Sequence, residues 1–144
     1  MTPELKSEIE DLVEEFELLD DWEQRYRYVI ELGKALPELA QSDRTDANKV
    51  KGCVSQVWLM SEIDPVDPTR IRFHAQSDAH IVQGLAALLL RLYSRRTPDD
   101  IDAIDARDIL TRIGLSEHLS PQRSNGLNAM ISRIQASASQ LSKR

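Results

Sequence analysis

Apolar residues in the first part of the chain recur every three to four positions, the spacing of one face of an α-helix. This pattern predicts two helices. Thr2-Pro3 begins the first, with a capping side chain before a proline at the first helical position. Asp20 or Asp21 caps the second, which ends before Pro37 because a residue preceding proline disfavours helical backbone. The two apolar faces are Leu5, Ile9, Leu12, Val13, Phe16 and Leu19, then Trp22, Tyr26, Val29, Ile30 and Gly33.

The middle of the chain changes to a period of two. Residues 54–62 and 70–75 alternate between the two sides of an extended chain and contain several β-branched and aromatic side chains. This pattern is typical of half-buried strands. Between them, the prolines and aspartates of residues 64–68 predict a turn. The two strands are therefore expected to form a hairpin.

Helical spacing returns after the hairpin. A broad apolar face over residues 79–93 predicts a helix in the core, with Asp78 as its N-cap. Thr97-Pro98 and Asp105 begin two short helices, the second of which stops at Gly114, and Ser120-Pro121 begins the last helix. Helices, a small antiparallel sheet and further helices predict an α+β fold. The length predicts one domain over residues 1–144.

Charge is unevenly distributed along this chain of net charge −6. Residues 1–23 carry ten acidic and one basic side chain, whereas the remainder carries 14 acidic and 17 basic ones. Nucleic-acid binding requires a basic surface, so this balance argues against it. We expect the acidic segment to be a solvated helix face, and a docking surface for a basic partner is the alternative. The longest apolar run, residues 85–90, is too short to span a membrane.

The sequence offers little support for metal or nucleotide chemistry. The three histidines, His74, His80 and His118, lack the spacing of zinc ligands, and the five glycines form no phosphate-binding loop. We therefore expect no metal site and no cofactor. His74 is predicted on the polar face of a strand, and His80 in the first turn of a helix. The single cysteine and an N-terminus without a signal-peptide pattern favour a cytoplasmic location.

Cys53 has the clearest potential for chemistry. It follows Gly52 and directly precedes a predicted strand, so its thiol is expected on a loop at a sheet edge. The nearby Lys49 and Lys51 would favour the nucleophilic thiolate. One alternative is a thiol hydrolase or thiol oxidoreductase; a hydrolase would need a histidine beside the cysteine. Another is an interaction domain in which the cysteine is inert, as most lone cysteines are.

Four segments of the chain resemble the SufE family. The most specific is the run Gly52-Cys53-Val54-Ser55-Gln56-Val57-Trp58. Further similarity lies in residues 28–37, 77–85 and 119–127, so that the resemblance covers nearly the whole chain. It implies an α+β fold in which a small three-stranded antiparallel sheet packs against helices, as in iron–sulfur scaffold proteins of the IscU type.

The resemblance implies a sulfur carrier rather than an enzyme. SufE-type proteins bind a PLP-dependent cysteine desulfurase of the SufS or CsdA type and accept the sulfur of its active-site persulfide on their own cysteine. They thereby stimulate the desulfurase, and they pass the sulfur on for iron–sulfur cluster assembly. In this chain the acceptor would be Cys53, and an iron–sulfur scaffold protein is a candidate recipient.

The resemblance also nominates residues that would contact the desulfurase. Asp78 and Arg123 lie in two of the other matched segments. Arg123 lies early in a helix, where the helix dipole does not favour a cation, so we expect a compensating carboxylate, within the chain or on the desulfurase. The residues around the cysteine that would shape the docking surface are Lys51, Gly52, Val54, Ser55 and Gln56.

Overall fold

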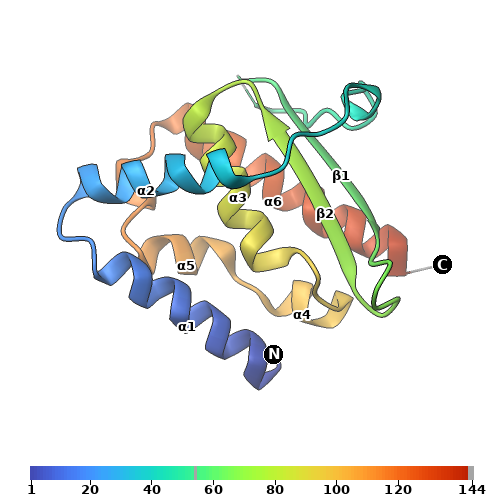
Figure 1. Ribbon diagram of the computed structural model, residues 1–144, viewed down its shortest axis with the longest axis horizontal. Helices are drawn as coiled ribbons and strands as arrows, with labels where there is room; N and C mark the ends of the chain where they lie inside the picture. Colours follow the sequence, from blue (N-terminus) through green and yellow to red (C-terminus); the bar gives the residue numbers. More distant parts are fainter. Residues whose placement is uncertain (54, 143–144) are drawn as a thin grey trace.

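Helices cover one face of a two-stranded antiparallel sheet (Figure 1). The computed structural model describes residues 1–53 and 55–142. The order of helices and strands agrees with the predicted α+β class. In chain order the elements are α1 (Pro3–Glu17), α2 (Trp22–Ala35), the 3-10 helix η1 (Gln41–Asp43), β1 (Val57–Ile63), β2 (Ile71–Ser77), α3 (His80–Tyr93), α4 (Pro98–Ala103), α5 (Ala106–Arg112), the 3-10 helix η2 (Ser116–His118) and α6 (Pro121–Ser142).

The predicted helix caps at Thr2, Asp21 and Asp105 are confirmed by hydrogen bonds that backbone N–H groups donate to these side chains. The Thr2 hydroxyl accepts from Leu5, and a carboxylate oxygen of Asp105 accepts from Asp108. Of the two candidates for α2, Asp21 is the cap, since it accepts from the N–H of Gln24 at 2.9 Å. Each cap satisfies a donor that the first helical turn leaves without a partner.

The hairpin forms with β1 and β2 in antiparallel register from Val57–Ser77 to Ile63–Ile71. β1 begins at Val57, three residues after the predicted start, and β2 continues two residues beyond the predicted end. The buried face of the hairpin consists of Val57, Leu59, Ile71, Phe73 and Ala75. His74 lies half-buried on the opposite face, as predicted, with its Nε2 3.1 Å from an oxygen of Glu62.

The expectation of a three-stranded sheet is not confirmed, because the described residues form only two strands. Residues 48–50 occupy the position of a third strand beside β1. There the Val50 N–H donates to Val57 O and the Leu59 N–H donates to Asn48 O, both at 2.8 Å. Turns at Asp46–Asn48 and at Lys51–Gly52 limit this pairing to a single bridge between Lys49 and Trp58.

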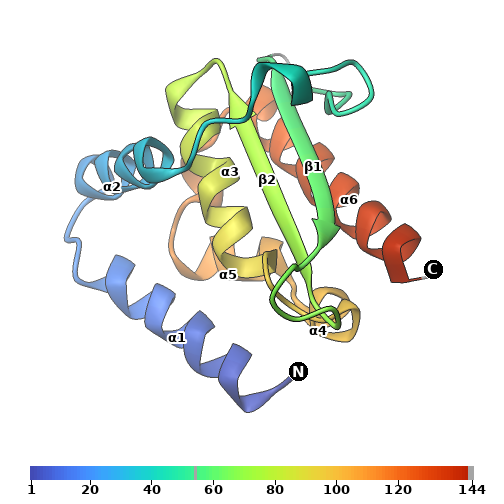
Figure 2. The ribbon, with the colours of Figure 1, turned by 45° about the vertical axis from the view of Figure 1, so that its right-hand side comes forward.

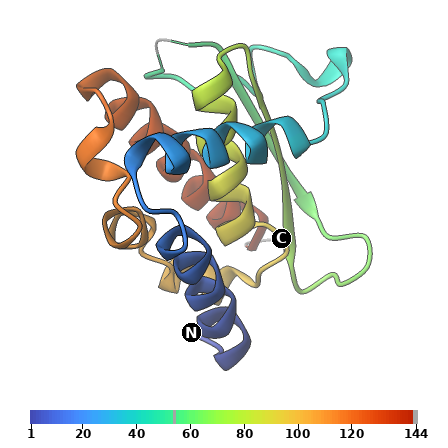
Figure 3. The ribbon, with the colours of Figure 1, turned by 60° about the vertical axis from the view of Figure 1, so that its left-hand side comes forward.

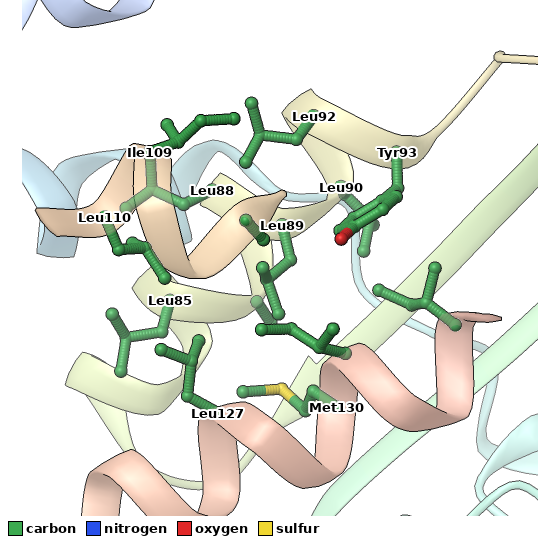
Figure 4. Packing of buried hydrophobic residues seen from close by; sticks show 14 of the residues in the cluster. Leu85, Leu88, Leu89, Leu90, Leu92, Tyr93, Ile109, Leu110, Leu127 and Met130 are labelled. Atoms are coloured by element: carbon green, nitrogen blue, oxygen red, sulfur yellow. The ribbon is translucent and has the colours of Figure 1, made fainter. Parts of the chain in front are cut away.

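Helix α3 forms the centre of the core, as its broad apolar face predicts. It packs against α2, β2 and α6, and α2 crosses it closely (Figure 3). This crossing requires glycine, because a Cβ on Gly33 would lie 2.6 Å from the backbone nitrogen of Gly84. On another side of α3, leucines interdigitate with side chains of α5 and α6 (Figure 4). This packing fixes α6 relative to the sheet.

Helix α1 is more than the solvated acidic face that we expected. Its apolar stripe is buried, and three of its carboxylates form ion pairs with arginines of the body. The pairs are Glu8–Arg96, Glu10–Arg112 and Glu15–Arg91. Arg91 also lowers the pKa of Glu15 through its hydrogen bond. Some of the negative charge predicted on this helix is therefore neutralised within the chain.

Across residues 1–53 and 55–142, no helix is both long and apolar enough to cross a membrane.

Candidate functional site

The loop that leads into β1 lies at the end of the sheet where β2 finishes (Figure 2). Cys53 is part of this loop. This placement confirms the expected loop at the sheet edge. Gly52 has a φ of 92°, in the left-handed region that favours glycine. That conformation directs the chain toward α6, where the half-buried Cys53 thiol donates to the carbonyl oxygen of Gly126 at 3.5 Å.

A cavity of about 350 Å³ opens beside the thiol. Most of its apolar lining comes from α3 and α6 and includes Leu85, Leu127 and Met130. Figure 4 shows these three side chains between the two helices. Polar residues line another part of the cavity. Together, the two sides place a thiol between an apolar pocket and hydrogen-bonding groups. The polar lining residues are Ser55, Ser120, Gln122 and Arg123.

Burial raises the pKa of the Cys53 thiol above its ordinary value. This direction is opposite to the expectation that Lys49 and Lys51 favour the thiolate. Lys51 is exposed, so water and salt screen its charge, whereas withdrawal from water acts directly on the sulfur. The resting thiol is therefore protonated at neutral pH, and it requires a change of surroundings before it can act as a nucleophile.

The sequence predicted Asp78 as the cap of α3, and this prediction is wrong. Asp78 instead binds Gln56 at the end of the loop that carries Cys53, which spans residues 47–56 and is called the cysteine loop. The N-cap of α3 is Ala79, which provides no capping side chain. Asp78 accepts the backbone N–H of Gln56 on Oδ1 at 3.0 Å and donates its own N–H to Gln56 O at 3.2 Å. These two bonds extend the hairpin by one position beyond the Val57–Ser77 pair. Asp78 therefore fixes the point at which the loop leaves the sheet.

Arg133, which the sequence did not mark as a site residue, binds residues 47–49, the stem of the same loop. Its Nη2 donates to Ala47 O at 2.6 Å and its Nη1 to Lys49 O at 3.3 Å. Arg133 lies on α6, and 86 and 84 residues separate it from its partners Ala47 and Lys49. A hydrogen bond between residues so far apart in the sequence cannot be predicted from a local sequence pattern.

The sequence profile of the SufE family, described as an Fe-S metabolism associated domain, matches residues 10–138. The chain belongs to the SufE family. Its membership confirms the resemblance found in the sequence and implies a role in Fe–S metabolism.

Two SufE-like relatives and one solved structure support this membership and fold. An uncharacterized SufE-like protein of Rhizobium etli is 54% identical over 132 residues, covering 90% of this chain and 88% of the relative. Another, from Rhizobium meliloti, is 52% identical, with coverage of 90% and 94%. The solution structure of a hypothetical protein from Thermus thermophilus has a TM-score of 0.77 at 19% identity, covering 95% of this chain and 97% of that one. This last likeness concerns the fold alone.

The SufE fold brings most of the predicted site residues to one place. Cys53, Ser55 and Arg123 line the cavity, and Asp78 binds Gln56 at its border. Lys51 and Gly52 are exposed on the loop, whereas Val54 lies outside the described residues.

The internal carboxylate partner expected for Arg123 is not found among the described residues. The backbone N–H of Arg123 donates to the Ser120 hydroxyl at 3.2 Å, which caps α6. Its guanidinium forms no ion pair with a carboxylate of residues 1–53 or 55–142, so the expected internal partner is not found. The charge of this half-buried side chain is therefore available at the cavity.

The described residues also contain no group of three metal-ligating side chains.

Proposed function

We propose that this SufE-family protein accepts sulfur on Cys53 from the persulfide of a PLP-dependent cysteine desulfurase. It thereby stimulates the desulfurase and passes the sulfur on for iron–sulfur cluster assembly, with an iron–sulfur scaffold protein as a candidate recipient. The observation that carries the proposal is the position of the only cysteine, on a loop beside a mostly apolar cavity in a SufE-family chain.

The sulfur transfer balances without an oxidant or a resident cofactor. The Cys53 thiolate attacks the terminal sulfur of the donor persulfide, so a sulfur–sulfur bond forms on Cys53 while the donor's sulfur–sulfur bond breaks. The donor cysteine leaves as a thiolate and takes up the proton that Cys53 gave up. The rate of such exchange depends on the thiolate fraction of the attacking group, the pKa of the leaving group and access to the sulfur.

Burial of Cys53 requires that the desulfurase change the loop when it docks. In the isolated protein the thiol is protonated and half-covered, which protects it from oxidants but slows attack. Movement of Cys53 away from Gly126 would break the bond between the thiol and the helix carbonyl. Exposure then removes the desolvation that raises the pKa, and the thiolate forms more readily.

The docking surface would surround the mouth of the cavity. Lys51 and Arg123 supply positive charge there, and both are free of ion pairs with the described residues. Such charges increase the rate of encounter with an acidic partner surface. The other proposed contact residues are Gly52, Val54, Ser55, Gln56 and Asp78.

Intact mass spectrometry tests this function directly. The protein is incubated with a cysteine desulfurase and cysteine without reductant, and Cys53→Ser serves as the matched control. We expect wild type to gain the mass of one sulfur, reversibly on reduction, and the serine variant to gain none. A serine variant that stimulates the desulfurase as strongly as wild type would contradict the proposal.

The same sample distinguishes a thiol enzyme from a sulfur carrier. A hydrolase or oxidoreductase would turn over a small ester, peptide or peroxide without a second protein. If no desulfurase transfers sulfur to a native, alkylatable Cys53, and the isolated protein shows such turnover, the carrier function is wrong. A thiol that resists alkylation until the protein is denatured would instead support the inert interaction domain.

A further inference from the structure

One face of α6 contacts the cysteine loop at both its tip and its stem. Gly126 accepts the Cys53 thiol, and the Cβ of Ala129 is the nearest atom to the position that a Cβ of Gly52 would take, at 3.4 Å. Arg133 lies one turn beyond Ala129 and binds the carbonyl oxygens of Ala47 and Lys49. Positions separated by three, four and seven residues share a helix face. The tip and the stem are therefore held by a single rigid element.

We propose that Arg133 is a positioning residue that restrains the cysteine loop and so sets how readily Cys53 is presented to reagents and to its sulfur donor. The part of this inference that concerns the sulfur donor rests on the proposed function. The restraint on the thiol does not, because it follows from the contacts of residues 47–53 with α6.

The strength of the restraint follows from the kinds of bond involved. At the tip, Cys53 is held by a thiol–carbonyl contact at 3.5 Å, and a thiol is a weak donor. At the stem, a guanidinium donates to two carbonyls that lie two residues apart. Hydrogen bonds from a charged donor are stronger than neutral ones. The stem contact is therefore the firmer of the two links between the loop and α6.

A guanidinium is suited to this task because its planar fork presents several donors in a fixed geometry, whereas an ammonium is a point charge on a flexible stem. The pair of bonds fixes the orientation of residues 47–49 as well as their distance from α6. These residues run directly into Val50, which is buried and paired with Val57. Loss of the fork would thus loosen the side of the loop that precedes Cys53 and leave the Gln56–Asp78 side intact.

A looser stem raises the fraction of molecules in which Cys53 is uncovered. When opening and closing are fast, the rate of a reaction that requires the open form is proportional to that fraction. Alkylation of Cys53 by iodoacetamide at a fixed pH measures it in the isolated protein. The informative variants are Arg133→Met, which removes both bonds, and Arg133→Lys, which retains the charge and can replace one of them.

The matched control is Arg107→Met. Arg107 also reaches α6 from outside, since its Nε donates to Oδ1 of Asn128 at 2.8 Å, but its hydrogen bond does not involve the cysteine loop. We expect alkylation to be about three- to tenfold faster in Arg133→Met, intermediate in Arg133→Lys and unchanged in Arg107→Met. Amide hydrogen exchange is expected to increase at residues 47–53 and to remain unchanged in α3 and β2.

An unchanged or slower alkylation rate in Arg133→Met, with unchanged exchange at residues 47–53, would overturn the inference. Faster exchange throughout the core would do so too, because it would reveal general destabilisation; should Arg133→Met fail to fold, Arg133→Lys provides the same comparison. Sulfur transfer from the desulfurase is measured separately. If wild type accepts no sulfur, the proposed function fails while the alkylation result still decides the role of Arg133.

Discussion

The backbone N–H of Gln56 donates to a carboxylate oxygen of Asp78 at 3.0 Å, and the N–H of Asp78 donates to the carbonyl oxygen of Gln56 at 3.2 Å. The two residues stand opposite one another at the end of the hairpin. A side chain thus replaces one of the two backbone groups that would continue the ladder. The pairing of the two strands ends there, and Cys53 lies on the loop that precedes Gln56.

Asp78→Ala is expected to lower the free energy of unfolding by about 1 kcal/mol, because it leaves the Gln56 N–H without its acceptor. Denaturant unfolding measures this loss. Asp78→Asn is the matched control, since its side-chain oxygen can still accept the bond while the charge is removed. If Asp78 also contacts the desulfurase through its charge, Asp78→Asn will weaken docking at unchanged stability. Equal stability of the alanine variant and wild type would contradict the structural role.

The alkylation rate of native Cys53 is expected to rise with pH to a midpoint above that of the unfolded chain, because burial raises the pKa of the thiol. An ordinary thiol titrates at about pH 8.5, and the urea-denatured protein supplies that reference. A native midpoint at or below the reference would show that the lysines outweigh burial.

The same raised pKa predicts a dependence of stability on pH. The folded protein favours the neutral thiol, so the contribution of Cys53 is fully present below the unfolded pKa of about 8.5. It is lost as pH rises through the higher pKa of the folded state. We expect wild type to lose stability relative to Cys53→Ser as the pH rises above about 8.5, the pKa of an unperturbed thiol. A constant difference as the pH rises would contradict the prediction.

Gly52→Ala and Gly126→Ala are expected to shift stability in opposite directions, although both lie where the loop meets α6. The positive φ of Gly52 makes alanine unfavourable there by about 1–2 kcal/mol. A Cβ on Gly126 would lie 3.5 Å from the Cys53 sulfur, which is an ordinary contact, and alanine favours a helix interior by up to about 1 kcal/mol. Denaturant unfolding of both variants tests the pair. A loss of stability in both would contradict the geometry assigned to the loop.

Gly84→Ala is expected to destabilise the protein by about 2–3 kcal/mol, which is the upper range for overpacking a core. A Cβ at this position would lie 2.7 Å from Cγ1 of Val29 and would also overlap backbone atoms of α2. Thermal unfolding measures the effect, and Ser132→Ala on the exposed face of α6 is the control. Wild-type stability in Gly84→Ala would mean that α2 and α3 can separate at little cost.

The sequence predicted the helices well because their start signals are local. Thr2, Asp21 and Asp105 each cap the helix that follows, and the apolar stripes mark the buried faces. The start of β1 was misplaced because alternation of side chains continues through residues 54–56. The start of β1 depends instead on the hydrogen bonds between Gln56 and Asp78, two residues that lie 22 positions apart in the sequence.

The candidate site was predicted in part for the same reason. The position of Cys53 on a loop followed from Gly52, a neighbour in sequence. Its protonation did not, because the desolvation that raises its pKa depends on how α6 packs against the loop. Arg133 was missed since its bonds to Ala47 and Lys49 span 86 and 84 residues. Local pattern identifies the reactive group, whereas its restraint arises from tertiary contacts.

The ion pairs of α1 have a consequence for electrophoresis and for shortened forms of the protein. Through Glu8, Glu10 and Glu15 this helix acts as a built-in counterion for arginines of α3, α5 and the turn after α3. Residues 1–23 hold ten of the 24 acidic side chains but only one of the 18 basic ones. A fragment lacking them would become a weak polycation at neutral pH and migrate toward the cathode.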